Sequence, residues 1–268
     1  MLSVAEREHY RETGWVRIPG VVPPSACVDV ADAVWRALER VHGFRRDDSA
    51  SWRSELPRRL GRRLAPADLA PLATPKLIAL IDDLLGAGNW DHPRVWAQPL
   101  PVFPAPGPWD VPSRMWHLDY PVRDLRPDDW AVKMLCLLSP LAPRGGGTLL
   151  LSGSHRLVGR LAAAGHRGGS ADVRTLLARE HEWLCALLSR TEGVDRVRRF
   201  MEEGARLDGV PVRVVEVTGE PGDVVLFHPW MLHTLAPNRR GEPRLLLAQN
   251  FTARSALWVY RPDPAGWR

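Results

Sequence analysis

The sequence predicts a mainly β protein with flanking helices, and three observations support this fold class. Residues 1–93 carry mostly helical patterning, with one short apolar run of strand length. Residues 94–252 hold several short apolar runs separated by turns rich in glycine and proline, as in a β protein. Residues 156–205 return to helical patterning within that region. We therefore expect one domain, 1–268, with a helical support region, a β core and a helical insertion.

The support region is expected to contain three helices, one strand and a surface loop. Ser3 offers a side-chain oxygen to the free amides of a first helix, and Gly14 permits the turn that follows it. Pro23 and Pro24 end the strand and begin the second helix. Gly86 ends the third helix. The expected helices cover residues 3–12, 25–41 and 75–85, the strand covers 15–22, and the loop covers 44–66.

The β core is expected to contain a series of short strands. The run 131–138 is almost continuously apolar, which is typical of a strand buried on both faces. Glycines at 145–147 permit a tight turn before the next strand, and Pro221 and Gly222 mark a turn between two later strands. The expected strands cover residues 94–103, 131–138, 148–151, 210–217, 224–228 and 245–252, and a proline-rich loop covers 104–112.

Composition argues against several classes of protein. The formal net charge is +5, but the chain has only two lysines, Lys76 and Lys133, and its arginines are interspersed with acidic residues. This pattern does not indicate a nucleic-acid partner, although it leaves a weak preference for anionic small molecules open. No apolar run approaches the ~20 residues of a membrane span, and the charged N-terminus is unlike a secretory signal, so we expect a cytoplasmic location.

The three cysteines, Cys27, Cys136 and Cys185, lie far apart in the sequence and form no CxxC pair. A disulfide framework or a zinc–thiolate site is therefore not expected. We interpret all three as small buried residues.

A potential metal site begins with His117 and Asp119, which are two residues apart. In a strand this spacing places both side chains on one face. His233 follows at the end of the strand region 224–232. Two histidines and one carboxylate that leave three coordination positions open form the facial triad of non-haem iron(II) oxygenases. Those open positions are needed for a chelating 2-oxo acid and O₂.

Arg244 makes this triad more specific, because it follows His233 at the start of the next expected strand. If residues 237–243 reverse the chain, Arg244 points into the same barrel. A guanidinium stays charged when buried and binds a carboxylate through two parallel hydrogen bonds. We therefore predict that Arg244 binds the far carboxylate of 2-oxoglutarate.

The order and spacing of three motifs resemble the phytanoyl-CoA dioxygenase superfamily over about residues 94–252. The motifs are WHLD at 116–119, LSGSHR at 151–156, and PGDVVLFH at 221–228 followed by His233 and Arg244. The resemblance implies a double-stranded β-helix core, which is a cupin-like jelly roll. It also implies Fe(II), with 2-oxoglutarate and O₂ as cosubstrates. By the same resemblance His117, Asp119 and His233 are the ligands and Arg244 and Gln98 bind the cosubstrate. Leu235 stands where some relatives have a small polar residue that contacts it.

Other residues near the motifs receive weaker assignments. Trp116 and Tyr120 flank the ligands, and one of them is a candidate for lining the substrate pocket. His155 is expected to stabilise its turn, and His228 is expected to point away from the site. Large aromatic side chains are most often part of the core.

The resemblance implies hydroxylation of an unactivated C–H bond in a small molecule, which the sequence leaves open among natural-product intermediates, amino acids and acyl thioesters. Desaturation, epoxidation or cyclisation by the same oxidative chemistry are alternatives. A halogenase is not expected, because it needs a small residue in place of Asp119. A cupin-like metalloenzyme that works without O₂ and a non-catalytic binding protein are the remaining readings. The sequence gives no indication of the oligomeric state.

The insertion 156–205 is rich in arginine. One interpretation is a solvated helical face. The other is a lid that closes over the substrate and presents arginines to an anionic group.

Overall fold

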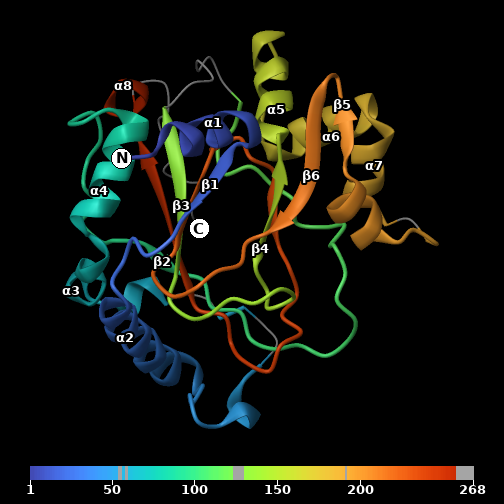
Figure 1. Cartoon of the computed structure of the whole chain (residues 1–268). Helices are drawn as coiled ribbons and strands as arrows, with labels where there is room; N and C mark the ends of the chain where they lie inside the picture. The colour runs from blue at the N-terminus through green and yellow to red at the C-terminus, as the bar shows by residue number, and fades with distance from the viewer. Residues whose placement is uncertain (54–55, 58–59, 123–129, 191, 258–268) are drawn as a thin grey trace.

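The computed structural model describes residues 1–53, 56–57, 60–122, 130–190 and 192–257. Two antiparallel sheets lie at its centre, with helices on their outer sides (Figure 1). One sheet has the strand order β1-β7-β3-β9-β2 and the other has the order β5-β6-β4-β8. This arrangement agrees with the expected mainly β fold and its jelly-roll core. The strands are β1 (Trp15–Ile18), β2 (Gln98–Pro99), β3 (Ala131–Leu137), β4 (Thr148–Ser152), β5 (Ala205–Leu207), β6 (Val210–Glu216), β7 (Val224–Phe227), β8 (His233–Leu235) and β9 (Leu246–Thr252).

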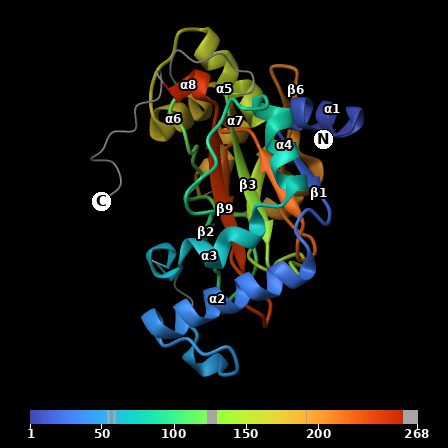
Figure 2. The same cartoon turned by 90° about the vertical axis from the view of Figure 1, so that its left-hand side faces the viewer.

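The N-terminal helices cover the outer face of the five-stranded sheet (Figure 2). They are α1 (Val4–Thr13), α2 (Pro24–His42), α3 (Pro66–Leu69) and α4 (Pro75–Leu85). Ser3 caps α1 as predicted: its Oγ accepts from the amide of Glu6 at 3.2 Å, and the Glu6 carboxylate accepts from the amide of Ser3 at 2.7 Å. Buried side chains of α2 and α4, such as Leu38 and Ile81, share one core with Met134 of β3. No helix of the described residues is long and apolar enough to cross a membrane.

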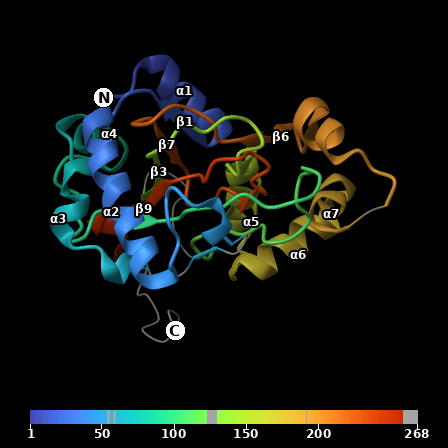
Figure 3. The same cartoon turned by 90° about the horizontal axis from the view of Figure 1, so that it is seen from below.

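The helical insertion packs on the opposite side, against the four-stranded sheet (Figure 3). It contains α5 (Ser154–Ala163), α6 (Ser170–Glu180), α7 (Glu182–Leu188) and a π-helix, Arg198–Glu203. Leu177, Leu184 and Phe200 are buried with Leu149 and Val212 of the sheet. The insertion is therefore an integral layer of the protein, because it covers one face of a sheet that would otherwise expose apolar side chains.

A small third core lies between the two sheets. It contains alternate residues of the strands, including Leu135, Leu150, Val225 and Phe227, whose neighbours in sequence point outward to the helices. This alternation follows from the two-residue period of a strand. The space between the two sheets therefore contains an apolar core, and the polar residues described below lie next to it.

Several predicted elements are shorter than expected. The first strand ends at Ile18 instead of residue 22, and the predicted strand 94–103 reduces to β2 and an isolated bridge between Val102 and Arg244. Pro99 and Pro101 have no amide hydrogen, so continuous strand pairing is not possible there. The loop 44–66 contains two short 3₁₀ turns, 49–51 and 61–63, and its residues 54–55 and 58–59 lie outside the described residues.

Several elements were missed by the sequence analysis, among them α3, β5, β8 and α8. β5 pairs with β6 through a two-residue turn at Asp208 and Gly209, which both have positive φ. An Asp-Gly pair is a strong hairpin signal, but it lay next to the helical patterning of the insertion. A final short helix, α8 (Arg254–Leu257), follows β9. Cys27 and Cys136 are buried as expected, whereas Cys185 is exposed, contrary to expectation; all three are free thiols.

Arg196 connects the insertion to the loop that leads toward the site. Its guanidinium is buried and donates to five backbone carbonyl oxygens at 2.6–3.2 Å. The acceptors are Val111 and Pro112 in the loop and Ala186, Leu187 and Ser189 at the end of α7. One side chain therefore satisfies carbonyl groups that the end of a helix leaves free.

Replacing Arg196 with methionine is expected to lower the free energy of unfolding by at least about 1–3 kcal/mol, because buried carbonyl groups lose their donors. Urea unfolding followed by circular dichroism measures this change. Arg198→Met is the matched control, since Arg198 is exposed and its side chain pairs with Glu203 at the surface. Equal, small effects of the two substitutions would show that Arg196 does not brace the loop.

Candidate metal centre

His117 and His233 come from different parts of the chain and meet as a backbone pair. The amide of each donates to the carbonyl of the other, at 2.9 and 3.0 Å, which forms an isolated antiparallel bridge. Side chains of directly paired residues lie on the same face. The rings consequently lie together, with centroids 4.2 Å apart. His117 and Asp119 do not lie on a strand as predicted: His117 forms this single bridge and Asp119 lies in a bend.

His233 also differs from its predicted position. β7 ends at Phe227, and the chain then crosses from the five-stranded to the four-stranded sheet before β8 begins at His233. Ser154 holds this crossing, because its Oγ accepts from the amide of Leu232 at 2.9 Å and contacts Met231 Sδ at 3.3 Å. The sequence analysis identified the histidine but not the crossing that places it.

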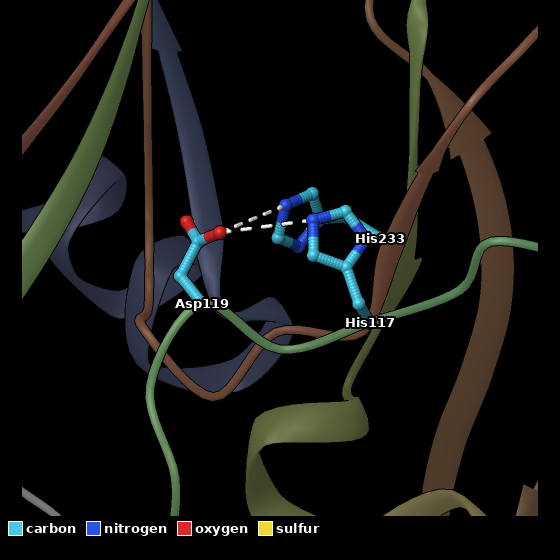
Figure 4. Close-up of side chains that lie close together, drawn as sticks. All are labelled: His117, Asp119 and His233. Carbon is cyan, nitrogen blue, oxygen red and sulfur yellow. Dashed lines mark ion pairs between the residues drawn. The ribbon is translucent and has the colours of Figure 1, made fainter. Parts of the chain in front are cut away.

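The donor atoms of His117, Asp119 and His233 converge on one point (Figure 4). Oδ1 of Asp119 lies 3.7 Å from Nε2 of His117 and 3.6 Å from Nε2 of His233. One donor atom from each residue lies within 4.8 Å of the others. Bonds of about 2.1 Å to a central ion would place neighbouring donor atoms roughly 3 Å apart. The set therefore fits a divalent metal ion after small side-chain shifts, with two nitrogen donors and one oxygen donor.

Both histidines are oriented for metal binding by the same device. Nδ1 of His117 lies 2.9 Å from the carbonyl oxygen of Met115, and Nδ1 of His233 lies 2.9 Å from that of Met231. A carbonyl can only accept, so each Nδ1 carries a proton, which leaves Nε2 as the nitrogen that would bind a metal. Burial lowers the pKa of His233 to about 3, with a further contribution from Lys133. The ring is thus neutral at physiological pH, which is the form that binds metals.

Lys133 is a site residue that the sequence analysis missed. Its Nζ lies 2.5 Å from Oδ2 of Asp119, and both side chains are 13% exposed. Burial alone would raise the pKa of Asp119, but His233, Lys133 and His117 outweigh burial and lower it. The carboxylate is therefore ionised. The sequence did contain a signal for this role, namely a lysine inside an apolar strand. Burying an unpaired ammonium group is costly, so such a lysine is expected to have an acidic partner.

Arg244 is 3% exposed and uses only part of its hydrogen-bonding capacity. Nη2 donates to the carbonyl of Leu100 at 2.6 Å, while Nε and Nη1 are buried and have no partner among the described residues. Burial lowers the pKa of Arg244 to about 9, so the group is still charged at neutral pH. A buried charge with two free donors is costly unless an anion binds it. The free donors match a ligand carboxylate.

The three candidate ligands, Arg244 and Gln98 line one cavity of about 950 Å³. Tyr120 also lines it, and its hydroxyl lies 2.9 Å from Oγ1 of Thr252. Trp116 does not: it is 1% exposed, belongs to the core beneath the insertion and donates through Nε1 to the carbonyl of Pro112 at 2.8 Å. Of the two aromatic candidates, the structure thus places Tyr120 at the cavity. Leu235 lines it as well.

The insertion does not contribute to this cavity among the described residues. It instead contacts the segment that carries Asp119. Oγ of Ser170 accepts from the amide of Leu118 at 2.9 Å, and Val122 forms a backbone bridge with Gly168. These contacts favour a bracing role for residues 156–205 over the lid that presents arginines to substrate.

His155 and His228 lie away from the cavity, beneath the end of α1. Their ring centroids are 5.2 Å apart, and Nε2 of His155 lies 3.1 Å from the carbonyl of Arg11. A Cβ at Gly14 would lie 2.4 Å from Nδ1 of His155, so the tight approach requires glycine there. His155 lies in the first turn of α5 rather than in a loop, and it ties the start of α5 to α1, so its role is structural as expected.

Burial and the nearby His228 lower the pKa of His155 to about 3 from an ordinary value of 6.5. The unfolded protein thus binds a proton at His155 below about pH 6.5 that the folded protein does not bind. Stability from this group is complete above pH 6.5 and is lost as the pH falls toward 3, by at most about 1.4 kcal/mol per pH unit. In metal-free protein, the unfolding free energy should depend less steeply on pH between 6.5 and 4 after His155→Gln. The slope should fall by close to the value for one bound proton, about 1.4 kcal/mol per pH unit. The exposed His166→Gln should leave the wild-type slope; an unchanged slope in both variants contradicts the assignment.

Comparisons with known proteins show what the chain is similar to in sequence and in fold. A sequence model of the family described as Phytanoyl-CoA dioxygenase (PhyH) matches residues 10–245. A search of curated proteins finds no significant match. Among solved structures, the chain is similar to the non-heme alpha ketoglutarate dependent carbocyclase SnoK from nogalamycin biosynthesis, with a TM-score of 0.55, 18% identity, and coverage of 94% of this chain and 84% of that one.

Two further structures contain bound groups. HygX from Streptomyces hygroscopicus, solved with nickel and 2-oxoglutarate bound, gives a TM-score of 0.55 at 17% identity and covers 94% of this chain and 88% of its own. The epimerase SnoN in complex with Fe³⁺, alpha ketoglutarate and nogalamycin RO gives a TM-score of 0.53 at 17% identity. The match covers 98% of this chain and 91% of the SnoN chain. At these identities the likeness establishes the shared fold.

Proposed function

The chain belongs to the phytanoyl-CoA dioxygenase family, and we propose that it is an Fe(II)- and 2-oxoglutarate-dependent oxygenase that hydroxylates an unactivated C–H bond of a small molecule. The observation that carries this proposal is the combination of two features in one cavity. These are a His–Asp–His cluster with converging donor atoms, and a buried guanidinium with two free donors. The cluster suits a metal with open positions, and the guanidinium suits the far carboxylate of its cosubstrate.

His117, Asp119 and His233 would hold the iron, and Arg244 would bind the far carboxylate of 2-oxoglutarate. Gln98, on β2 of the cavity wall, would donate a hydrogen bond to the same cosubstrate. Iron with 2-oxoglutarate and O₂ supplies the oxidising power for C–H cleavage and leaves succinate and CO₂. Asp119 contributes a negative charge, and the two imidazoles contribute the lone pairs of Nε2.

The remainder of the cavity is proposed to bind the primary substrate. Its walls include the apolar Leu56, Leu60 and Val95 and the polar Tyr120 and Asn250. A cavity of about 950 Å³ lies at the upper end of the range for drug-sized ligands, roughly 300–1,000 Å³, and greatly exceeds the needs of 2-oxoglutarate alone. We therefore favour a large amphipathic molecule, such as a natural-product intermediate, over a free amino acid.

Asn250 would contribute to recognition of that molecule. Its amide oxygen is buried and has no hydrogen-bond partner among the described residues. An unpaired buried acceptor is costly, and a hydroxyl or N–H group of the substrate would satisfy it. Asn250 would thus fix the orientation of a polar substrate group beside the iron site.

A second candidate is ring closure or epimerisation with the same cofactor set. It is favoured by the carbocyclase and epimerase named among the similar structures. Hydroxylation adds one oxygen atom to the substrate, cyclisation by C–H oxidation removes two hydrogen atoms, and epimerisation leaves the mass unchanged. Mass spectrometry of the product therefore distinguishes the three outcomes.

The proposal is tested by incubating the Fe(II)-loaded protein with 2-oxoglutarate, air and a panel of candidate substrates. We expect at least one amphipathic substrate to increase succinate release, with loss of the increase when iron or O₂ is withheld. Turnover of a substrate without O₂ and without succinate would instead support a non-oxidative metalloenzyme. Tight substrate binding without any turnover would support a binding protein.

A further inference from the structure

The three candidate ligands differ in how they are anchored. His117 and His233 are held by their mutual backbone bridge and by hydrogen bonds from Nδ1 to a carbonyl two residues earlier. Asp119 lies in a bend outside any strand. Among the hydrogen bonds of the described residues, its carboxylate has one partner, Nζ of Lys133. The position of the third ligand thus depends on this lysine.

Lys133 itself is held firmly. It lies in the middle strand of the five-stranded sheet, paired with Phe227 of β7 on one side and Asn250 of β9 on the other. Its Nζ also lies 6.0 Å from the centroid of the Phe227 ring, within the range of a cation–π contact. The ammonium group is therefore presented to Asp119 from a rigid element of the fold.

The two carboxylate oxygens of Asp119 have different environments. Oδ1 faces Nε2 of both histidines at 3.6–3.7 Å, whereas Oδ2 faces Lys133 at 2.5 Å. We propose that Lys133 is a positioning residue that holds Asp119 as a one-oxygen metal ligand, an inference that rests on the proposed iron site. A carboxylate that is free to turn can bind a metal through both oxygens. The second oxygen would then occupy a position that 2-oxoglutarate or O₂ requires.

The positioning role and the charge of Lys133 predict opposite changes in metal affinity when the lysine is removed. An ammonium close to a divalent cation repels it, so removal of Lys133 by charge alone should strengthen metal binding. Removal of a partner that orients a ligand should weaken it, typically by about 10–100-fold. The sign of the change therefore separates a positioning role from a mere charge effect.

The experiment uses Co(II) as the probe, because its affinity and its visible spectrum, which reports coordination number and geometry, can both be measured without a substrate. Lys133→Met should bind Co(II) about 10–100-fold more weakly than the wild type and should alter its visible spectrum. Lys133→Arg keeps a charged donor and should recover most of the affinity. Lys76→Met is the matched control, since Lys76 is the other lysine of the chain and its Nζ donates to the carbonyls of Pro19 and Gly20, away from the site. Circular dichroism checks that each variant is folded.

A double-substitution cycle shows whether Lys133 acts through Asp119. In an Asp119→Ala background, Lys133→Met should cause no further loss of affinity, because the carboxylate that it positions is absent. An equal loss in both backgrounds would overturn the inference. So would a Lys133→Met variant that binds Co(II) as tightly as the wild type, or more tightly, with the same spectrum. Failure of the wild-type protein to bind Co(II) would overturn the iron site itself, which is a separate result.

Discussion

Arg244→Met is expected to weaken 2-oxoglutarate binding by about one and a half to three and a half orders of magnitude, while iron binding stays close to that of the wild type. The basis is the loss of a buried charge pair, for which truncation costs about 2–5 kcal/mol. Arg244 lines the cavity, its Nε and Nη1 have no partner among the described residues, and it is not among the three clustered ligands. Titration of 2-oxoglutarate into the anaerobic Fe(II) protein, followed by visible absorption, measures the change.

Arg240→Met provides the matched control for this prediction. Arg240 lies four residues earlier, is exposed, and donates to the carbonyl of Pro143. Its replacement should leave cosubstrate affinity unchanged. If Arg244→Met loses iron but binds 2-oxoglutarate like the wild type, Arg244 has a structural role and does not bind the cosubstrate carboxylate.

Alanine at His117, Asp119 or His233 is expected to abolish turnover and to reduce metal affinity more than any change at a residue that only orients a ligand, for which the loss is about 10–100-fold. Each substitution leaves two donor atoms where the cluster has three. Calorimetric titration with Co(II) measures the affinity, and succinate release measures turnover. His166→Ala, at an exposed position on the insertion, serves as the control. Near wild-type turnover in any of the three variants would remove that residue from the proposed ligand set.

The sequence allowed accurate prediction where local signals determine the structure. The helix α4 spans Pro75–Leu85 as expected, because Thr74 caps its first turn, Pro75 suits its first position, and Gly86 follows its last. The strand β3 was also found within one residue, since an apolar run of this length has few alternatives. The family resemblance then carried the ligand and cosubstrate assignments, which remain proposals.

Features that depend on contacts between distant segments were not predictable. The crossing that carries the chain from β7 to His233 depends on pairing of His233 with Leu150 and with His117. In the sequence, Lys133 is an isolated charged residue within an apolar strand. Its pairing with Asp119 could not be predicted, because it depends on the bend that brings Asp119 close to it. The sequence also could not show which of Trp116 and Tyr120 lines the cavity. Both lie in an irregular segment, where the direction of each side chain depends on contacts with distant parts of the chain.

Three layers of the protein contribute to the site. The five-stranded sheet carries Lys133, the four-stranded sheet carries His233, and the insertion contacts the segment of Asp119 through Ser170. A site built on both sheets can hold its donor atoms near the geometry that a metal requires before the metal arrives. Loss of the contact between Ser170 and Leu118 would therefore affect the site through its support.

The most direct test of the proposed function is a crystal structure of the protein grown without O₂ in the presence of Fe(II) and 2-oxoglutarate. The account predicts iron bonded to Nε2 of His117, one carboxylate oxygen of Asp119 and Nε2 of His233. It also predicts the far carboxylate of 2-oxoglutarate on the free donors of Arg244. Iron bound elsewhere, or 2-oxoglutarate bound without contact to Arg244, would contradict it.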